Sequence, residues 1–369
     1  MAEIKSLWYT RCPVPTPLGI AAQLGWIEEE FRPDGIAVRT LQDETDRELR
    51  DSHFDHRLPH SFRQGGNIPA IWARSTGRDT RVVGLTWTDE AQVLLTSPKS
   101  GIRDVLDLKG KRLGVATRPN DLIDFWKATT IRAYVAALHL HGLSERDVEL
   151  VELPRQDVSS AGWPSEPLAR SVEAQALARG DVDVIFHKGS RGVELADAVG
   201  AHTVFDVGAH PDPLVRVNNG SPRTLTVDGA LLRDHFPVVV RILKRVIAAG
   251  RWAEAHPAES VAYVARETRS AEAAVRRAYS QDVHRNLRTS LDEASLDALA
   301  NFTHFLASWK FIPRDFDVHA WIDPRPLRQA LRELASEEAS AEPAAPTLEP
   351  AAPQRRAEAA ASLNAAEGR

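Results

Sequence analysis

The stretch that decides the fold is residues 4–31, which read IKSLWYTRCPVPTPLGIAAQLGWIEEEF. The apolar run at its start is typical of a β-strand, and the apolar residues of 18–31 recur at helical spacing. Thr16 suits the N-cap of this helix, and Pro17 suits its first position, where a missing N–H costs nothing. The stretch therefore predicts a strand, a tight turn and a helix, which together are the repeating unit of an α/β protein.

The predicted turn contains Cys12, the only cysteine among the 369 residues. The start of a helix presents unpaired backbone N–H groups and the positive end of the helix dipole, a setting that favours an anion or a thiolate. A single cysteine is nevertheless more often a small buried apolar residue. Position alone therefore leaves both interpretations of Cys12 open.

Strands and helices alternate along most of the chain. Strands are expected at 36–41, 80–87, 91–96, 111–116, 147–153, 181–186 and 202–207, and helices at 68–75, 121–141, 167–179 and 191–199. From residue 237 onward the pattern predicts helices alone, at 237–256, 259–267, 271–279, 290–309 and 326–335. The alternation predicts an α/β protein with mainly parallel sheets.

Composition narrows the class of protein. A chain of 369 residues exceeds the usual size of one domain, and its 43% hydrophobic residues suffice for two cores. The net charge is −5 with both signs interspersed, so we expect no nucleic-acid partner. No apolar run is long enough to cross a bilayer, and the first residues lack a signal-peptide pattern, so we expect no membrane association and a cytoplasmic location.

Residues 51–67, DSHFDHRLPHSFRQGGN, combine three histidines, Arg63 and a diglycine. We interpret them as a loop in which Gly65 and Gly66 let the backbone approach a ligand closely. His53, His56 and His60 match no standard catalytic metal-binding spacing, so a metal site is the weaker hypothesis and we expect none.

Two phrases resemble signatures of the periplasmic-binding-protein-like (type II) superfamily, which includes receptors for sulfonates, nitrate and taurine. They are DLKGKRLGV at 107–115 and ARGDVDV at 178–184. The resemblance implies an α/β fold of two lobes with a ligand cleft between them. We expect residues 1–95 to form the first part of lobe 1, 96–209 to form lobe 2, and 210–335 to return to lobe 1 with the C-terminal helices. Residues 336–369 are mostly Ala, Glu and Pro, so we expect a disordered tail.

A sharper resemblance is to the bacterial aromatic sulfinate desulfinases, the family that acts on 2'-hydroxybiphenyl-2-sulfinate. It rests on Cys12-Pro13-Val14-Pro15, His53-Phe54, Arg63, Gly65-Gly66 and Ile68-Pro69 in this order, and continues to Gly250-Arg251-Trp252-Ala253 and Ala320-Trp321. It implies that Cys12 is the reactive group, that His53 and Arg63 line the sulfinate site, and that Gly66, beside Gly65, offers a backbone N–H. It further implies a hydrolase that splits a carbon–sulfur bond and releases sulfite. Separately, we expect a monomer.

Two chemical routes fit these residues, and neither requires a cofactor. Cys12 could give a proton to the ring carbon, or its thiolate could attack sulfur, with His53 orienting or deprotonating the thiol. Residues 186–192, FHKGSRG, depart from the aromatic segment of the family. This departure favours a smaller substrate or one with a second acidic group, and the alternative interpretation is that Lys188 and Arg191 are the solvated start of a helix. Trp72, Trp126 and Trp163 are candidates for an aromatic wall elsewhere.

Two alternatives remain. The first is the solute-binding protein of an ABC importer for sulfonate-like anions, which would require export from the cytoplasm. The second is the pyrimidine-synthase branch of the same fold, whose cysteine-rich motif is absent from this sequence.

Overall fold

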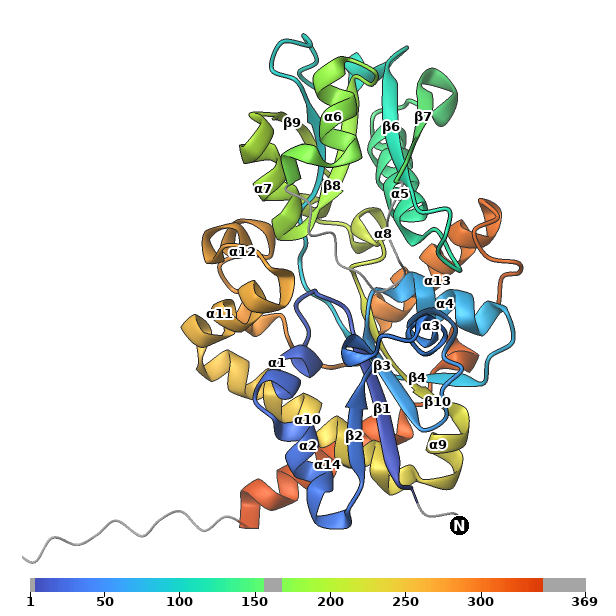
Figure 1. The fold of residues 1–369 in the computed structure, drawn as a ribbon, viewed down its shortest axis with the longest axis vertical. Coiled ribbons are helices and arrows are strands. Elements are labelled where there is room, and N and C mark those ends of the chain that lie inside the picture. The colour runs from blue at the N-terminus through green and yellow to red at the C-terminus, as the bar shows by residue number, and fades with distance from the viewer. Residues whose placement is uncertain (1–3, 156–167, 341–369) are drawn as a thin grey trace, which may run out of the picture.

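A computed structural model describes residues 4–155 and 168–340 of the chain. It contains two five-stranded sheets, each flanked by helices and stacked along the long axis of the molecule (Figure 1). The two-lobe α/β architecture predicted from the sequence is therefore confirmed.

The sheet of lobe 1 has the strand order β2-β1-β3-β10-β4. Its strands are β1 (Ser6–Arg11), β2 (Ala37–Thr40), β3 (Ser61–Gly65), β4 (Thr80–Thr86) and β10 (Arg223–Asp228). The helices of this part are α1 (Pro17–Gln23), α2 (Trp26–Phe31), α3 (Arg47–Asp55), α4 (Asn67–Ser75), α9 (Gly229–Asp234), α10 (Phe236–Ala255), α11 (Pro257–Thr268) and α14 (Arg325–Ser340). Residues of α1, α2, α10 and α14 bury their apolar sides against β1 and β10 in one continuous core.

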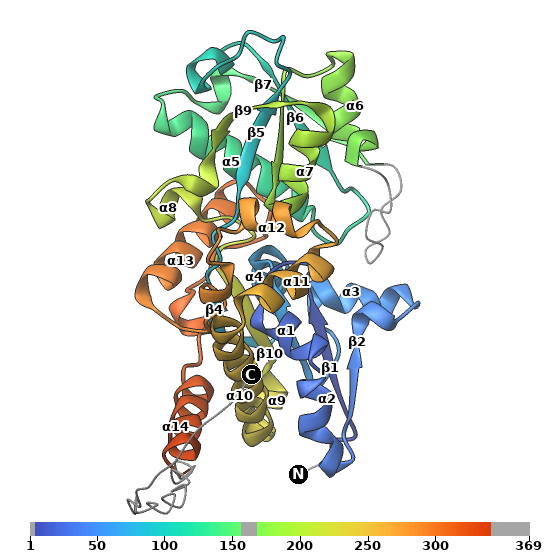
Figure 2. The same ribbon diagram turned by 90° about the vertical axis from the view of Figure 1, so that its left-hand side faces the viewer.

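The sheet of lobe 2 has the strand order β7-β6-β8-β5-β9. Its strands are β5 (Gln92–Thr96), β6 (Arg112–Thr117), β7 (Glu149–Pro154), β8 (Val184–Lys188) and β9 (His202–Asp206). The helices here are α5 (Phe125–Leu140), α6 (Val172–Arg179), α7 (Gly189–Val199) and α8 (Pro213–Arg216). Two later helices, α12 (Glu272–Ala278) and α13 (Glu293–Ser308), lie where the lobes meet, α12 against α7 and α13 against α8 (Figures 1 and 2).

Both sheets are mixed, which corrects the expectation of mainly parallel sheets. In lobe 1, β1 runs parallel to β2 and β3, but β10 runs antiparallel to both β3 and β4. In lobe 2, β5 runs antiparallel to β8 and β9. The sequence pattern did not predict β10, although this strand fills a central place in the first sheet.

The boundaries of the lobes also differ from those expected. Strand β5 belongs to the second sheet, so the chain crosses between the lobes within residues 87–91 and not after residue 95. It crosses back within 207–222, before β10. Helix α14 continues to Ser340, five residues into the predicted tail, and the rest of the tail lies outside the described residues.

The opening stretch folds as a strand, a turn and two short helices. The Thr16 side chain accepts a hydrogen bond from the Gly19 N–H at 3.0 Å, and Pro17 begins α1. The single helix expected over 18–31 is interrupted at Gly25, whose φ of 75° lies in the left-handed region that favours glycine.

The loop predicted at 51–67 is wrong in most of its length. Asp46 caps α3 by accepting a hydrogen bond from the Glu48 N–H at 2.8 Å, and this helix carries His53. Strand β3 carries Arg63. Phe54 is buried in the core, and it provides the apolar face that the charged residues before it lack. His53 and Arg63 therefore stand on regular elements, and only a short turn separates them.

In the part of the chain that the structure describes, no helix combines the length and apolar character needed to cross a membrane.

Candidate active site

Cys12 directly follows β1, at the carboxyl ends of the parallel strands β1 and β3. Its backbone N–H donates to the Gln64 carbonyl of β3 at 3.2 Å, which fixes the turn beside β3. The side chain is half-buried, so the thiol is neither sealed in apolar packing nor fully solvated. In α/β proteins, ligands bind outside the carboxyl ends of the parallel strands.

Three of the predicted site residues meet at the sulfur. The Cys12 Sγ lies 3.4 Å from Arg63 Nη2 and 3.6 Å from His53 Nε2, and the same two nitrogens lie 3.4 Å apart. The three groups come from the end of β1, from β3 and from α3. The sequence resemblance had grouped these residues, and the structure brings them into one cluster.

Arg63 is fully buried, and no carboxylate of the described residues forms an ion pair with it. Its Nε donates to the His53 carbonyl at 3.0 Å and its Nη1 to the Gly66 carbonyl at 2.8 Å. Burial lowers the pKa of the guanidinium, with the Cys12 sulfur acting in the opposite direction. A buried cation without a carboxylate partner favours an anion in contact with it.

The contacts of Arg63 limit how it could hold a sulfinate. Two of its three nitrogens already donate to backbone carbonyls, and Nη2 points at the sulfur of Cys12. A two-pronged grip on a sulfinate, which a guanidinium can offer to two acceptor oxygens, is therefore restricted to the Nη side of Arg63. Arg63 also connects helix α3 to the start of α4 through these hydrogen bonds. It therefore holds the two elements in place and supplies a positive charge to the site.

His53 is held from behind by Thr10, whose Oγ1 lies 2.9 Å from Nδ1. Burial lowers the pKa of His53 well below its ordinary value, and the positive charge of Arg63 lowers it further. The imidazole is therefore neutral at pH 7. A hydroxyl both donates and accepts, so Thr10 can pair with either neutral tautomer and leave Nε2 to accept from the thiol or donate to a thiolate.

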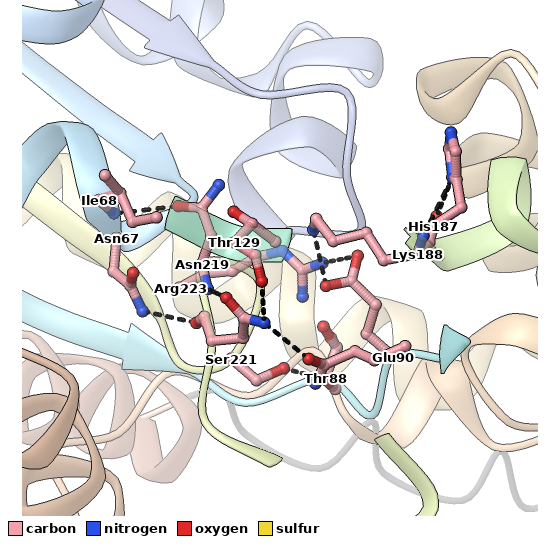
Figure 3. Close-up of polar contacts among 12 residues, drawn as sticks. Asn67, Ile68, Thr88, Glu90, Thr129, His187, Lys188, Asn219, Ser221 and Arg223 are labelled. Carbon is pink, nitrogen blue, oxygen red and sulfur yellow. Dashed lines mark hydrogen bonds and ion pairs between the residues drawn. The ribbon is translucent and has the colours of Figure 1, made fainter. Parts of the chain in front are cut away.

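The two glycines are explained by close packing. A Cβ on Gly65 would lie 2.2 Å from Cys12 Sγ, and a Cβ on Gly66 would lie 2.5 Å from Asn219 Oδ1. Asn219 in turn accepts hydrogen bonds from the N–H groups of Asn67 and Ile68, which open α4 (Figure 3). The donation of the Gly66 N–H to a substrate stays a prediction.

The three histidines of this region do not converge. His56 Nε2 lies 3.1 Å from Thr226 Oγ1, and the ring of His60 packs edge-on against His235. Among the described residues, the group whose side chains could together hold a metal ion is Glu293, Asp297 and His319, which are exposed. His53, His56 and His60 thus have separate partners and are not grouped as ligands of one ion in the described part of the chain.

Aromatic rings lead from the reactive cluster into lobe 2. Phe54, next to His53, packs against Phe125 at 6.3 Å, and the rings of Phe125 and Trp126 lie 6.4 Å apart. Trp126 then meets His187 at 5.1 Å. Trp126 is therefore suited to the predicted aromatic wall, whereas Trp72 packs on the hydrophobic core and Trp163 lies outside the described residues.

Thr10, Gln64 and Asn219 were not predicted from the sequence. Thr10 pairs in register with Arg63, so both side chains face the same side of the sheet. Gln64 accepts from the Leu18 N–H at 2.9 Å, which anchors the first turn of α1. Side chains alternate between the two faces of a strand. Thr10 could therefore have been predicted as a neighbour of Arg63 if the pairing of β1 with β3 had been known.

No protein-family model matches the chain. The 2'-hydroxybiphenyl-2-sulfinate desulfinase of Rhodococcus erythropolis is 26% identical over 357 residues, which cover 88% of this chain and 93% of that protein. A putative aliphatic sulfonates-binding protein of Bacillus subtilis is 34% identical over 102 residues, 27% of this chain and 30% of that protein.

Solved structures show the same two resemblances. A cysteine-to-serine variant of the desulfurization enzyme DszB in complex with biphenyl-2-sulfinic acid superposes with a TM-score of 0.71 at 25% identity, covering 89% of this chain and 99% of that one. The alkanesulfonate-binding protein SsuA from Xanthomonas axonopodis has a TM-score of 0.63 at 19% identity, covering 88% and 99%. The chain is thus a homologue of 2'-hydroxybiphenyl-2-sulfinate desulfinase with the periplasmic-binding-protein-like fold that sulfonate receptors share.

Proposed function

We propose that this protein is a desulfinase that hydrolyses an aryl sulfinate to the arene and sulfite. The observation that carries the proposal is the contact between the Cys12 sulfur and the buried guanidinium of Arg63, which has no carboxylate partner within residues 4–155 and 168–340. A reactive thiol and a site for one small oxyanion thereby share one position. The similarity to the Rhodococcus desulfinase supports the same reaction class.

The charges favour Cys12 as a proton donor. With the sulfinate bound, Arg63 already has one anion beside it, and a thiolate in the same place would add a second anion against a single cation. If the thiol instead gives its proton to the ring carbon, the carbon–sulfur bonding pair remains on that carbon and neutral sulfur dioxide departs. The negative charge passes to Cys12, so Arg63 neutralises one anion throughout.

Water completes the reaction. Sulfur dioxide and water give hydrogen sulfite and a proton, and the proton returns to the Cys12 thiolate. The sum is aryl sulfinate plus water giving arene plus hydrogen sulfite. Neutral His53 with its proton on Nε2 can donate to the Cys12 sulfur both before and after proton transfer, while Nδ1 accepts from the Thr10 hydroxyl.

Sulfite release from biphenyl-2-sulfinate tests the proposal. The wild-type protein should release sulfite and biphenyl in equal amounts, and Cys12→Ser should release neither while still binding the sulfinate. Ser61→Ala, a change on the same sheet away from the sulfur, serves as the control and should retain turnover. Equal sulfite release by wild type and Cys12→Ser would refute the role of Cys12.

A second candidate function is a receptor for sulfonate-like anions, and the likeness to sulfonate-binding proteins favours it. A receptor would bind methanesulfonate or taurine tightly and would turn over no sulfinate. Tight sulfonate binding without sulfite release from any aryl sulfinate would replace the desulfinase proposal with this one.

A further inference from the structure

A second cluster of buried charges lies where the two crossing segments of the chain meet (Figure 3). Glu90 belongs to the first crossing, Lys188 ends β8 of lobe 2, and Arg223 begins β10 of lobe 1. Lys188 Nζ lies 2.9 Å from Glu90 Oε2, and Arg223 Nη2 lies 3.2 Å from Glu90 Oε1. The side chains of Lys188, Glu90 and Arg223 are only 9%, 2% and 0% exposed.

This cluster carries one positive charge in excess. Burial opposes ionisation of Glu90, but the charges of Lys188 and Arg223 outweigh it and lower the pKa of the carboxyl, so Glu90 neutralises only one of the two cations. In addition, the Nε and Nη1 atoms of Arg223 are buried and have no hydrogen-bond partner among the described residues. Buried charge and buried donors without partners are costly, and an added anion would remove both costs.

Two glycines lie beside the cluster, at points where any side chain would clash with the charged groups. A Cβ on Gly220 would lie 1.6 Å from Glu90 Oε2 and 3.0 Å from Lys188 Nζ. Gly189, with φ of 62°, would place a Cβ 3.2 Å from Glu90 Oε1. Gly189 also opens α7, an 11-residue helix without a side-chain cap. The positive end of that helix therefore adds to the field of Lys188 at this point.

The cluster adjoins the reactive site on two sides. Asn219, which touches Gly66 next to the Cys12 site, immediately precedes Gly220. His187, which meets the ring of Trp126, immediately precedes Lys188. A substrate that reached from Arg63 past Trp126 would thus extend toward Lys188 and Arg223.

We infer that Lys188 and Arg223 form a second anion subsite, which receives an acidic group on the same substrate and makes an aryl sulfinate bearing a carboxylate the preferred class. The inference rests on the proposed function for the identity of the first group, the sulfinate. It also gives a physical basis for the positive charge in the sequence phrase at 186–192. Arg191 Nη1 lies 3.9 Å from Glu194 Oε2 in its own helix, so the charge of Arg191 has a carboxylate partner outside the cluster.

Binding to the Cys12→Ser protein tests the subsite without turnover. The probes are benzenesulfinate and its 2-, 3- and 4-carboxy derivatives, titrated by calorimetry at pH 7.5. At least one carboxy isomer should bind ~10-fold or more tightly than benzenesulfinate, the gain expected from one charge-assisted hydrogen bond. Equal affinities for all four probes would overturn the inference.

Two substitutions change the charge of the cluster in opposite directions. Lys188→Met should remove most of the carboxylate gain and leave benzenesulfinate binding unchanged, whereas Glu90→Gln should increase the gain. Lys188→Arg, which keeps the charge, should retain the gain, and Arg191→Met is the matched control that should not alter it. If Lys188→Met and Glu90→Gln shift only the melting temperature, the cluster is a structural ion pair and the inference fails.

The two proposals can fail separately. Sulfite release from benzenesulfinate without any carboxylate gain would leave the desulfinase function standing and remove the subsite. A Lys188-dependent gain in a protein that releases no sulfite would leave the subsite and remove the enzymatic function.

Discussion

The Gly65→Ala variant tests the geometry of the reactive cluster most directly. An added Cβ would lie 2.2 Å from Cys12 Sγ and 2.8 Å from Cys12 Cβ, whereas ordinary contact begins at 3.4 Å. The sulfur would therefore have to move by about 1.2 Å, more than the ~1 Å misplacement that can reduce a catalytic rate about 100-fold. Crowding of this kind also costs about 1–3 kcal/mol of the free energy of unfolding.

We therefore expect Gly65→Ala to lower kcat for sulfite release about 100-fold while the protein remains folded. Gly66→Ala is the matched control, since its Cβ meets Asn219 and not the thiol. Both variants should be destabilised, but the loss of kcat should be at least ~10-fold smaller in Gly66→Ala. Because Cys12 is the only cysteine, the rate of alkylation by iodoacetamide reports on this one sulfur. A Gly65→Ala protein with wild-type kcat and alkylation rate would refute the described packing of Cys12 against Gly65.

Three further predictions follow from the contacts of the site. Thr10→Val should lower kcat ~10-fold with little change in KM, because His53 loses the hydrogen bond that holds its ring, and Thr10→Ser should restore kcat; no rescue by serine would remove the positioning role. Arg63→Lys should raise KM and also lower kcat. Lysine keeps the charge but offers one nitrogen in place of the two separate nitrogens that donate to the His53 and Gly66 carbonyls. A change in KM alone would mean that Arg63 only binds the anion. Burial and then Arg63 lower the pKa of His56 to about 3, and burial lowers the pKa of His187 to about 4, so protonation below pH 6.5 favours the unfolded chain. The free energy of unfolding should be fully maintained above pH 6.5 and fall by about 1.4 kcal/mol per histidine between pH 7.5 and 5.5. Urea denaturation at the two pH values measures this loss. His56→Gln should reduce it by about one third, because burial also lowers the pKa of His53 well below its ordinary value and His53 contributes a similar loss. An unchanged loss would exclude His56 as a source of it.

The elements that the sequence predicted correctly are those with strong local signals. The strand before Cys12 and the N-cap at Thr16 follow from nearest-neighbour chemistry, and both are present. Strand β10 carried no such signal for its place in the fold, because its position between β3 and β4 depends on pairing with residues 137 to 165 positions earlier. Helix α3 was missed for a similar reason. Most of its residues are polar, and the apolar contact that holds it to the core is made by Phe54.

The residues of the reactive cluster likewise differ in whether the sequence could identify them. Cys12, His53 and Arg63 were identified by resemblance, and their separation in sequence conceals that their side chains touch. Thr10, Asn219 and the Glu90–Lys188–Arg223 cluster could not be found without the strand register and the crossing of the chain between lobes. Polar side chains whose partners come from distant segments leave no periodic pattern to detect.

Strand β10 lies far along the sequence from the other strands of its sheet, and this affects the order in which the chain can fold. Lobe 2 has a sheet made from one continuous segment, β5 to β9, whereas the sheet of lobe 1 cannot close until residues 223–228 have been synthesised. During translation the strands β5 to β9 can therefore pair with one another while β3 and β4 still lack the strand that joins them. The sheet that carries the Cys12 site thus receives β10, the strand next to β3, only after all five strands of lobe 2 have been synthesised.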